Sequence, residues 1–322
     1  MSLYQISPVI PSLYNVFMAH VIVLAGGDSD ERDISLLSGA AVASALQTAG
    51  HTVTTIDPQG GLDSHQDALQ QCDVVFPALH GKYGEDGGVQ TFLEDHKIPF
   101  VGSDSKASRL CFDKDEYTKL LAERGIYVPK TELVDQVAFE QSELIKKPFV
   151  LKPNDGGSSI DTFIIRDVAQ FDKQDFEPAF ERHATLLLQE LIEGVETTVA
   201  VLGTMPLAVI EIIPPQDGEF DYENKYNGMT QELCPPLHVS IEAQQAAQAL
   251  AKTIHDATGC RDMSRTDIII TSDFRLCVLE TNTIPGLTNQ SLLPKAAAQA
   301  GISMPQLCDQ LVQFALTRPL AA

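Results

Sequence analysis

The first hundred residues alternate short apolar runs with one amphipathic stretch. The runs have the length and β-rich composition of buried strands. They cover residues 20–25, 52–56, 74–78 and 100–101. Between the first two runs, apolar side chains recur at helical spacing, at Ile34, Leu37, Ala41 and Ala45. Because strands that alternate with helices are typical of parallel sheets, this part of the chain is predicted to form a small parallel sheet.

From residue 103 onward the pattern changes. Residues 103–128 are charged and amphipathic, which predicts a helical segment. Residues 214–236 lack periodicity, which indicates a long loop of the kind that often acts as a lid. Further β-rich runs cover residues 149–152, 163–165, 186–189, 197–202 and 207–213. A helix is predicted at 241–258, then a hairpin of two runs, 266–271 and 276–280, with its turn at 272–275, and two short helices close the chain.

Composition limits the classes of function. At 322 residues the chain exceeds a single hydrophobic core, so two or three domains are expected. Its 22 basic and 44 acidic residues give a net charge of −22. No basic cluster occurs, and nucleic-acid binding depends on such clusters. We therefore expect no nucleic-acid partner.

Cysteine usage and hydropathy indicate a cytoplasmic protein without a membrane partner. The six cysteines are scattered without a C-x-x-C motif, as expected for free thiols in a reducing compartment. No apolar run approaches the length of a membrane span. No Lys or Arg precedes Arg32, so a secretory signal lacks its basic start. Residues 1–17 are interpreted as either an extension upstream of the first strand or a misassigned start.

The carboxyl-terminal hairpin carries the strongest chemical signal. Residues two apart on a strand share a face, so Asp267, Glu280 and Asn282 are predicted to lie on one side. Three oxygen donors without His or Cys suit a hard cation such as Mg²⁺. Arg265 shares that face and can hold an anion beside the metal, which favours chemistry on phosphate. Solvated acidic edges remain the alternative for each acid alone, but they leave the three donors and the arginine together unexplained.

Two loops at the ends of predicted strands are candidate ligand sites. Residues 26–32 lie between a strand and a helix, where backbone N–H groups favour anions, but they lack the third glycine of a dinucleotide fingerprint. Glu31 in this loop can pair with an amino-acid ammonium, and an acid interacting with the helix dipole explains it equally well. His80 follows another strand, at the edge where open α/β sheets bind ligands, although single histidines are more often structural.

Two further segments are candidates for phosphate contact. Lys152 ends a strand and precedes Gly156, Gly157, Ser158 and Ser159, so its charge and the loop amides can grip phosphates. The lysine comes before the glycines, so this is not a Walker motif, and a solvated turn is the alternative. In the predicted loop, Lys225 can neutralise a phosphoryl group and Tyr226 can close over a substrate, although this dipeptide alone is a weak signal.

In their order along the chain, these segments resemble the D-alanine–D-alanine ligases of the ATP-grasp superfamily. The resemblance runs from about residue 21 to the carboxyl end. It rests on Gly-Gly-x-Ser-x-Glu-Arg at 26–32, Leu-His-Gly-x-x-Gly-Glu-Asp-Gly at 79–87, Asp-Lys at 113–114, Lys-Pro at 152–153, Gly-Ser-Ser at 157–159, Asp-Tyr-Glu-x-Lys-Tyr at 221–226, Arg-x-Asp at 265–267 and Glu-x-Asn-Thr-x-Pro-Gly-x-Thr at 280–288. It implies an α/β fold with an α+β ATP-grasp portion, in three domains: residues 1–102 (amino-terminal substrate domain), 103–191 (central domain) and 192–322 (catalytic domain).

The resemblance also implies an ATP-dependent ligation of two D-alanines for peptidoglycan, through an acylphosphate, by a homodimer. The implied ATP contacts are Lys114, Lys152, Ser159, Gln189, Glu190, Glu196 and Lys225. Asp267, Glu280 and Asn282 are the implied ligands of two Mg²⁺ ions, which Mn²⁺ can replace. Glu31, Ser158 and Tyr226 form an implied network around the first D-alanine. Arg265 and Gly286 stabilise the oxyanion, and His80, Ser291 and Leu292 contact substrate.

Several positions depart from the family pattern. Asp161 stands where the family usually has glycine, Gly156 where it often has glutamate, and Gln189 where it often has glutamate in the adenine strand. We expect these changes to weaken ATP binding, because Asp161 adds negative charge beside a phosphate loop. Two alternatives follow: a ligase with another amino-acid or hydroxy-acid acceptor, and a degenerate homologue that binds nucleotide without turnover. Tyr226 argues against D-lactate, because the family's D-lactate branch tends to carry His there.

Overall fold

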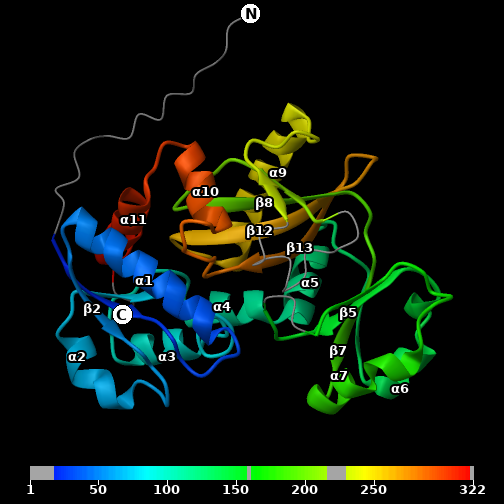
Figure 1. Cartoon of the computed structure of the whole chain (residues 1–322), viewed down its shortest axis with the longest axis horizontal. Coiled ribbons are helices and arrows are strands. Elements are labelled where there is room, and N and C mark those ends of the chain that lie inside the picture. Colours follow the sequence, from blue (N-terminus) through cyan, green and yellow to red (C-terminus); the bar gives the residue numbers. More distant parts are fainter. Residues whose placement is uncertain (1–17, 158–160, 216–229, 320–322) are drawn as a thin grey trace, which may run out of the picture.

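The computed structural model describes residues 18–157, 161–215 and 230–319. Figure 1 shows three sheet-containing units, two of them stacked together and the third set to one side. The amino-terminal sheet is parallel in the order β2-β1-β3. Its strands are β1 (His20–Leu24), β2 (Thr52–Ile56) and β3 (Val74–Pro77). The parallel sheet predicted from the sequence is therefore confirmed.

Helices cover this first sheet. They are α1 (Arg32–Ala49), α2 (Gln66–Gln70) and α3 (Gly88–Asp95), with a short 3₁₀ turn η1 (Asp63–His65). The helix predicted from Ile34 to Ala45 is confirmed as α1. The strand predicted at 100–101 is wrong, because Phe100 makes only a single bridge to Val75 before the chain turns at Gly102 with φ +101°.

The charged segment at 103–128 is two helices with a break between them. These are α4 (Ser105–Phe112) and α5 (Lys114–Glu123). At Asp113 the backbone is extended, and its carboxylate accepts a hydrogen bond from Glu116 N at 3.0 Å. An aspartate that caps a helix in this way satisfies an otherwise unpaired amide. It therefore starts α5 in a new direction and places Lys114 at its first turn.

The central unit is a four-stranded antiparallel sheet in the order β4-β7-β5-β6. Its strands are β4 (Thr131–Val134), β5 (Phe149–Pro153), β6 (Phe163–Ile165) and β7 (Leu186–Glu190). Short helices cover one face: α6 (Gln136–Gln141), η2 (Leu144–Lys146), η3 (Lys173–Phe176) and α7 (Glu177–Arg182). Phe139, Phe149 and Phe176 pack edge to face in its core, at ring distances of 5.4–6.3 Å.

The third sheet runs β11-β10-β8-β12-β13, with β9 paired to β8. Its strands are β8 (Val195–Leu202), β9 (Met205–Pro206), β10 (Ile210–Ile213), β11 (Gln231–Leu233), β12 (Met263–Ile270) and β13 (Leu276–Asn282). β11 lies inside the stretch predicted to be loop, so that prediction is wrong at residues 231–233. The predicted hairpin is confirmed as β12–β13. Helices α9 (Ile241–Thr258), α10 (Leu292–Gln299) and α11 (Met304–Thr317) complete the unit.

One hydrophobic core joins the first and third units. It contains Val23 and Phe76 from the parallel sheet together with Met263 from β12 and Leu311 from α11. α1 packs against α11 across this boundary. The central unit has a separate core made by residues 134–188. This arrangement holds β1, β3 and β12 in a fixed relation, and the central unit lies to one side of them (Figure 1).

Candidate active site

Two adjoining cavities lie where the three units meet. We call the first the Arg265 cavity, because Arg265 lines it together with residues from α1, the loop after β3, the end of α4, β13 and the start of α10. The second, the Lys152 cavity, lies between the central and third sheets and also has Asp267 in its wall. Its volume of about 480 Å³ is in the range of small-molecule sites. Four residues line both cavities: Lys114, Gly156, Gly157 and Glu280.

The register of β12 and β13 groups the predicted metal ligands. Arg265 is opposite Asn282, and Asp267 is opposite Glu280, with a bulge after Asp267. Opposite residues share a face of a sheet, so these four side chains lie on one face, as the sequence predicts. Asp267 lines the Lys152 cavity and Asn282 the Arg265 cavity, while Glu280 borders both.

Arg265 and Asp267 form a bidentate ion pair. Arg265 Nε donates to Asp267 Oδ1 at 3.0 Å, and Nη2 donates to Oδ2 at 2.8 Å. Thr198 Oγ1 also donates to Oδ1 at 2.5 Å. Burial alone lowers the pKa of Arg265, but the facing Asp267 carboxylate outweighs it and raises that pKa overall. A permanent positive charge is therefore fixed beside Glu280 and Asp267.

The donor chemistry at this junction fits a hard cation. Two carboxylates and one amide carbonyl supply only oxygen atoms, which Mg²⁺ prefers. Within the described residues, no three His, Cys, Asp or Glu side chains are grouped to hold a metal. A cation here would need Asn282 and non-protein oxygens as well, such as phosphate oxygens, and Mg²⁺ usually binds in that manner.

Lys114 connects the two cavities. Its ammonium donates to the backbone oxygen of Gly156 at 2.6 Å and lies 3.6 Å from Glu280 Oε2. Asn154 fixes the start of α5, because its Oδ1 accepts from Asp115 N at 2.8 Å and its Nδ2 donates to Asp113 Oδ1 at 3.0 Å. The lysine is buried to 8% exposure. A charge held this firmly is already placed for an anionic ligand.

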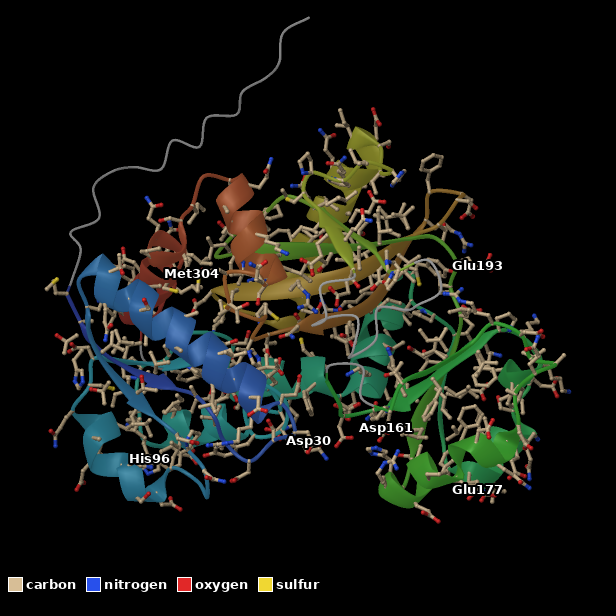
Figure 2. The ribbon with its side chains drawn as sticks, in the orientation of Figure 1. Asp30, His96, Asp161, Glu177, Glu193 and Met304 are labelled. Carbon is tan, nitrogen blue, oxygen red and sulfur yellow. The ribbon has the colours of Figure 1, made fainter. Side chains whose placement is uncertain are left out.

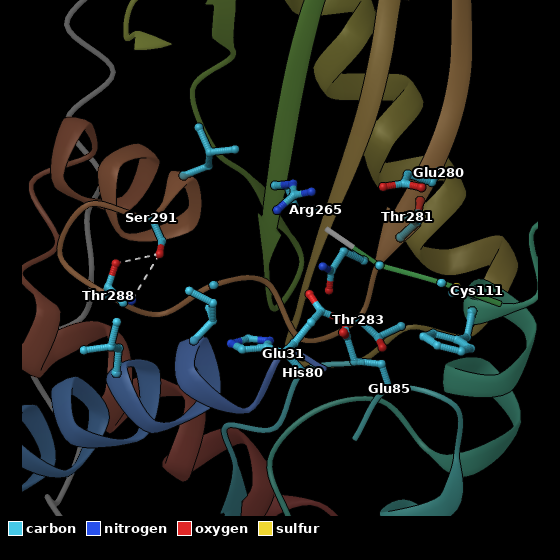
Figure 3. Close-up of a pocket in the computed structure, with 18 of the residues that line it drawn as sticks. Glu31, His80, Glu85, Cys111, Arg265, Glu280, Thr281, Thr283, Thr288 and Ser291 are labelled. Atoms are coloured by element: carbon cyan, nitrogen blue, oxygen red, sulfur yellow. Dashed lines mark hydrogen bonds between the residues drawn. The ribbon is translucent and has the colours of Figure 1, made fainter. Parts of the chain in front are cut away.

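The amino-terminal unit contributes Glu31 and His80. Both are buried, at 7% and 5% exposure, and Figure 3 shows them across the cavity from Arg265. A Cβ atom built on Gly81 or Gly157 would lie 2.7 or 2.6 Å from Glu31 Oε2. Both glycines therefore let the backbone approach this carboxylate, and Gly157 brings the phosphate-loop candidate against Glu31.

His80 is held neutral and oriented. Burial lowers its pKa to about 4. Its Nε2 lies 2.9 Å from Ser38 Oγ, and its backbone oxygen accepts from Ser29 Oγ at 2.6 Å. Ser29 lies in the glycine-rich loop, and Ser38 lies in α1. A neutral imidazole lining the cavity can exchange hydrogen bonds without adding charge.

Glu85 is a buried acid that sequence reasoning did not select. Burial, with a contribution from the Glu31 carboxylate, raises the pKa of Glu85 to about 8. Its Oε2 accepts from Gly81 N at 2.7 Å. Glu232 of β11 was also missed and lines the same cavity, paired with Lys295 of α10. The Gly-Glu-Asp-Gly sequence was a signal for Glu85, whereas only the folded chain brings Glu232 to the cavity.

The turn after β13 forms the remaining wall. Gly286 approaches Ser291 closely, since a Cβ on Gly286 would lie 2.8 Å from Ser291 Oγ. Ser291 Oγ accepts from Thr288 N at 3.1 Å and lies 2.8 Å from Thr288 Oγ1 (Figure 3). Leu292 begins α10 beside them. The structure thus brings Gly286, Ser291 and Leu292 together with Arg265 in one cavity.

The Lys152 cavity contains the predicted nucleotide residues. Lys152, Gln189, Glu190 and Glu196 all line it. Gln189 Nε2 donates to Thr131 Oγ1 at 2.9 Å, and Glu190 Oε1 accepts from Lys130 N at 2.9 Å. Glu211 was missed by sequence reasoning and also lines it; its carboxylate accepts from Leu237 N and His238 N at 2.9 and 3.0 Å.

Four predicted site residues lie outside the described part of the chain. These are Ser158, Ser159, Lys225 and Tyr226. Asp161, which the sequence marked as an awkward departure, is described and lies on the side of the central unit that faces the rest of the molecule (Figure 2). It is paired with Arg182 and His183. No helix in the described residues is both long and apolar enough to span a membrane.

Comparison with known proteins identifies the family. The family described as D-ala D-ala ligase C-terminus matches residues 120–313, and the one described as D-ala D-ala ligase N-terminus matches residues 57–103. The D-alanine–D-alanine ligase of Xanthobacter autotrophicus is 41% identical over 92% of this chain and 98% of its own. That of Zymomonas mobilis is 39% identical over 92% and 94%.

Solved structures agree with the sequence matches. The D-alanine–D-alanine ligase of Bacillus anthracis superposes with a TM-score of 0.81 at 30% identity, covering 92% of this chain and 97% of that one. A structure of the Bacillus anthracis ligase complexed with ATP gives 0.78. VanG D-Ala:D-Ser ligase from Enterococcus faecalis gives 0.77 at 30% identity, over 92% and 99%. Both halves of one family, relatives at 39–41% identity and the same ATP-grasp architecture lead to one conclusion: the chain belongs to the D-alanine–D-alanine ligase family of ATP-dependent ligases.

Proposed function

We propose that this chain joins two D-alanine molecules into D-alanyl-D-alanine, with ATP as phosphoryl donor, and so supplies the dipeptide for peptidoglycan precursors. The junction of two cavities at Lys114 and Glu280 carries the proposal. One cavity offers groups suited to amino acids, and the other offers groups suited to a nucleotide. Phosphoryl transfer depends on placing both reactants in line, and the junction is where they would meet.

In the first step the carboxylate of one D-alanine attacks the γ-phosphorus of ATP, which forms an acylphosphate and releases ADP. Glu31 binds the ammonium of this D-alanine, and His80 contacts it as a neutral group. Lys114 and Lys152 hold the phosphates, with Ser159 and Lys225 in the same role. Gln189, Glu190 and Glu196 bind the adenosine portion. Positioned positive groups lower the cost of charge developing on the phosphoryl oxygens.

In the second step the amine of the other D-alanine attacks the acyl carbon, the C–O bond breaks and inorganic phosphate leaves. Arg265 and the N–H of Gly286 stabilise the oxyanion that forms during the attack. Ser291 and Leu292 receive the carboxylate of the second D-alanine. Glu31, Ser158 and Tyr226 form the network that closes the site.

Asp267, Glu280 and Asn282 would hold two Mg²⁺ ions, with Mn²⁺ as a substitute. When bound, these ions offset charge on the phosphates. For this to happen, the Asp267 carboxylate must share its oxygens between Arg265 and the cation. Four acceptor directions on two carboxylate oxygens allow this sharing.

We also propose a cytoplasmic homodimer with domain divisions at residues 102 and 191, so that each of the three sheets belongs to a different domain.

The second candidate function is ligation of D-alanine to a different acceptor, because VanG is named a D-Ala:D-Ser ligase and has 30% identity to this chain.

The proposal is tested by ATP-dependent phosphate release across a panel of D- and L-amino acids and D-lactate. D-alanine should give the highest kcat/KM, and the product should be the dipeptide by mass. A clear preference for D-serine or D-lactate as acceptor would replace the proposed substrate. ATP binding without turnover for any member would indicate a degenerate homologue.

Glu280→Gln tests the metal assignment. Loss of one anionic ligand at the cavity junction should reduce Mg²⁺-dependent turnover by at least 100-fold, in line with losses at electrostatic catalytic groups. Glu242→Gln is the matched control, because Glu242 is exposed on α9. Circular dichroism should show that both variants remain folded. Wild-type phosphate release by the Glu280 variant would remove Glu280 from the metal set.

A further inference from the structure

Two of the six cysteines lie close together in a buried position. Cys111 Sγ and Cys260 Sγ are 3.8 Å apart, although 149 residues separate them in sequence. Both thiols are free, and their residues are 5% and 7% exposed. Cys111 is the second-last residue of α4, and Cys260 follows α9. The pair therefore spans the contact between these two helices.

Cys111 also belongs to the wall of the Arg265 cavity (Figure 3). A small solute that enters this cavity therefore meets Cys111, one member of the pair, in the cavity wall. Phe112 and Lys114, which follow Cys111 directly, line the same cavity. The sulfur pair is thus attached to the segment that places Lys114 at the cavity junction.

The surroundings of the pair favour a reactive sulfur. Thr258 Oγ1 donates to Cys260 Sγ at 3.2 Å. The hydrogen bond from the Cys111 thiol, opposed by burial, lowers the pKa of Cys260, while the same hydrogen bond and burial raise the pKa of Cys111. Cys308, in contrast, is buried in α11, and burial raises its pKa to about 12. Thiolate character and access control cysteine oxidation. Cys260 has the lowered pKa and Cys111 lies in the cavity wall, whereas Cys308 has neither property.

We propose that Cys111 and Cys260 form a reversible disulfide when the chain meets hydrogen peroxide, and that this modification switches off the ligase. The Cys260 thiolate attacks one peroxide oxygen, the O–O bond breaks, and hydroxide leaves and takes up a proton as water. Cys260 is then a sulfenic acid. The Cys111 sulfur attacks the Cys260 sulfur, the S–O bond breaks and a second water leaves. Two thiols lose two electrons and two protons in total, and one peroxide is reduced.

The disulfide changes the geometry of the active site. A disulfide bond is about 2.05 Å long, so the two sulfurs must approach by about 1.8 Å from their 3.8 Å separation. As the gap closes, the end of α4 and the segment after α9 are drawn together, and we expect this to displace Phe112 and the start of α5. Lys114 would leave its contacts with Gly156 and Glu280. Misplacement of about 1 Å can reduce turnover by about 100-fold.

The test uses the full chain, reduced with dithiothreitol, freed of reductant and exposed to hydrogen peroxide. Peptide mapping should find Cys111 linked to Cys260, with two of six thiols lost. ATP-dependent turnover should fall at least tenfold and recover with dithiothreitol. ATP together with D-alanine should slow the reaction by filling the cavity. The peptide map does not depend on which acceptor the enzyme uses, so failure of the proposed function and failure of this inference are separable.

Two serine variants complete the test. Cys260→Ser should keep its turnover after peroxide, whereas Cys308→Ser, the matched buried control, should lose turnover like the wild type. If Cys260→Ser does not fold, the peptide map of the wild-type chain decides the question alone. A different cysteine pairing, oxidation to sulfinic acid without a disulfide, or a disulfide that leaves turnover unchanged would each overturn the proposal.

Discussion

At Asp161, a contact with Arg182 changes the electrostatic effect expected of the carboxylate. From sequence, its carboxylate adds repulsive charge near the phosphates. In the structure, Arg182 Nε and Nη2 donate to its two oxygens at 3.0 and 2.5 Å, and His183 Nε2 lies 2.9 Å from Oδ2. The hydrogen bonds from Arg182 lower the pKa of Asp161, so it stays ionised but its charge is offset. Its φ of +54° is also left-handed, which explains why glycine suits this position.

Removing Arg182 should therefore leave the negative charge of the Asp161 carboxylate without its partner guanidinium. Arg182→Ala is expected to raise the KM for ATP about two- to fivefold, since an exposed ion pair contributes little, and high salt should reduce the effect. Lys146→Ala is the control, because Lys146 pairs with Glu143 on the surface of the same unit. In the Arg182→Ala background, Asp161→Gly should restore the KM. No restoration would mean that Arg182 acts independently of Asp161.

Glu85 predicts a pH dependence of stability. Its folded pKa of about 8 lies above the ordinary value of 4.5, mainly because of burial. Between these two values the folded chain binds more protons at Glu85 than the unfolded chain does. Its contribution to the free energy of unfolding is therefore present below pH 4.5 and is lost as pH rises toward 8. Glu85→Gln, which mimics the protonated acid, should remove this loss.

Urea unfolding at pH 5.5 and pH 8.5 measures the difference. The wild type should lose more stability over this range than Glu85→Gln, by at least about 1.4 kcal/mol, which is one pKa unit. Asp67→Asn is a suitable control, because Asp67 is exposed on α2 of the same unit. Parallel pH profiles for wild type and Glu85→Gln would show that Glu85 is not the titrating group.

At the scale of elements, close packing of α1 on β1 positions Glu31. A Cβ atom on Gly39 would lie only 2.2 Å from the Cβ of Ala25. Alanine usually favours a helix over glycine by about 1 kcal/mol, but here it must push α1 away from the sheet. We expect Gly39→Ala to destabilise the fold by about 1–3 kcal/mol, as overpacking does, and to lower kcat by moving Glu31.

Ser44→Ala is the matched control for this prediction. Ser44 is exposed on the same helix, so it gains helix propensity without a clash. Thermal unfolding should move in opposite directions for the two variants. Equal or higher stability of Gly39→Ala would show that α1 can shift without cost, and its contact with β1 would then not fix the site.

Elements with strong hydrophobic periodicity could be predicted from the sequence, whereas strands that form only by pairing with a neighbouring strand could not. The composition of the buried strands and the periodicity of α9 predict these elements. In addition, Ser240 and Gly259 cap the two ends of α9. β4 and β11 are short and half polar, and pairing with β7 and β10 makes them strands. The break at Asp113 depends on one capping hydrogen bond.

The same distinction applies to the site. Asp267, Glu280 and Asn282 were predictable because a hairpin fixes their register locally. Glu232 and Glu211 reach the cavities only through pairing of distant strands, so their sequence neighbourhoods carry no signal. Asp161 was identified, but its partners Arg182 and His183 lie 21 and 22 residues away. Charge alone therefore could not predict that Asp161 is paired.

At the scale of the whole molecule, the core of the described residues is divided into four clusters, one of which is shared by the first and third units. The first and third units are stabilised by one cluster that includes Val23 and Leu311, whereas the central unit has its own cluster around Phe149 and Leu188. The cavities lie between these bodies. Sub-global opening usually follows such divisions of the core. The first and third units should therefore open together, and the central unit should open separately.

Hydrogen exchange on two cavity-creating variants tests this division. Leu311→Ala should cost about 2–5 kcal/mol and reduce amide protection in β1 and β12 alike, because both strands depend on the shared cluster. It should leave β5 and β7 protected as in the wild type. Leu188→Ala should have the reverse pattern, because Leu188 is fully buried in the central core. Loss of protection in all three sheets from either variant would mean that the chain unfolds as one body, and the central unit could then not move over bound nucleotide without weakening the rest of the fold.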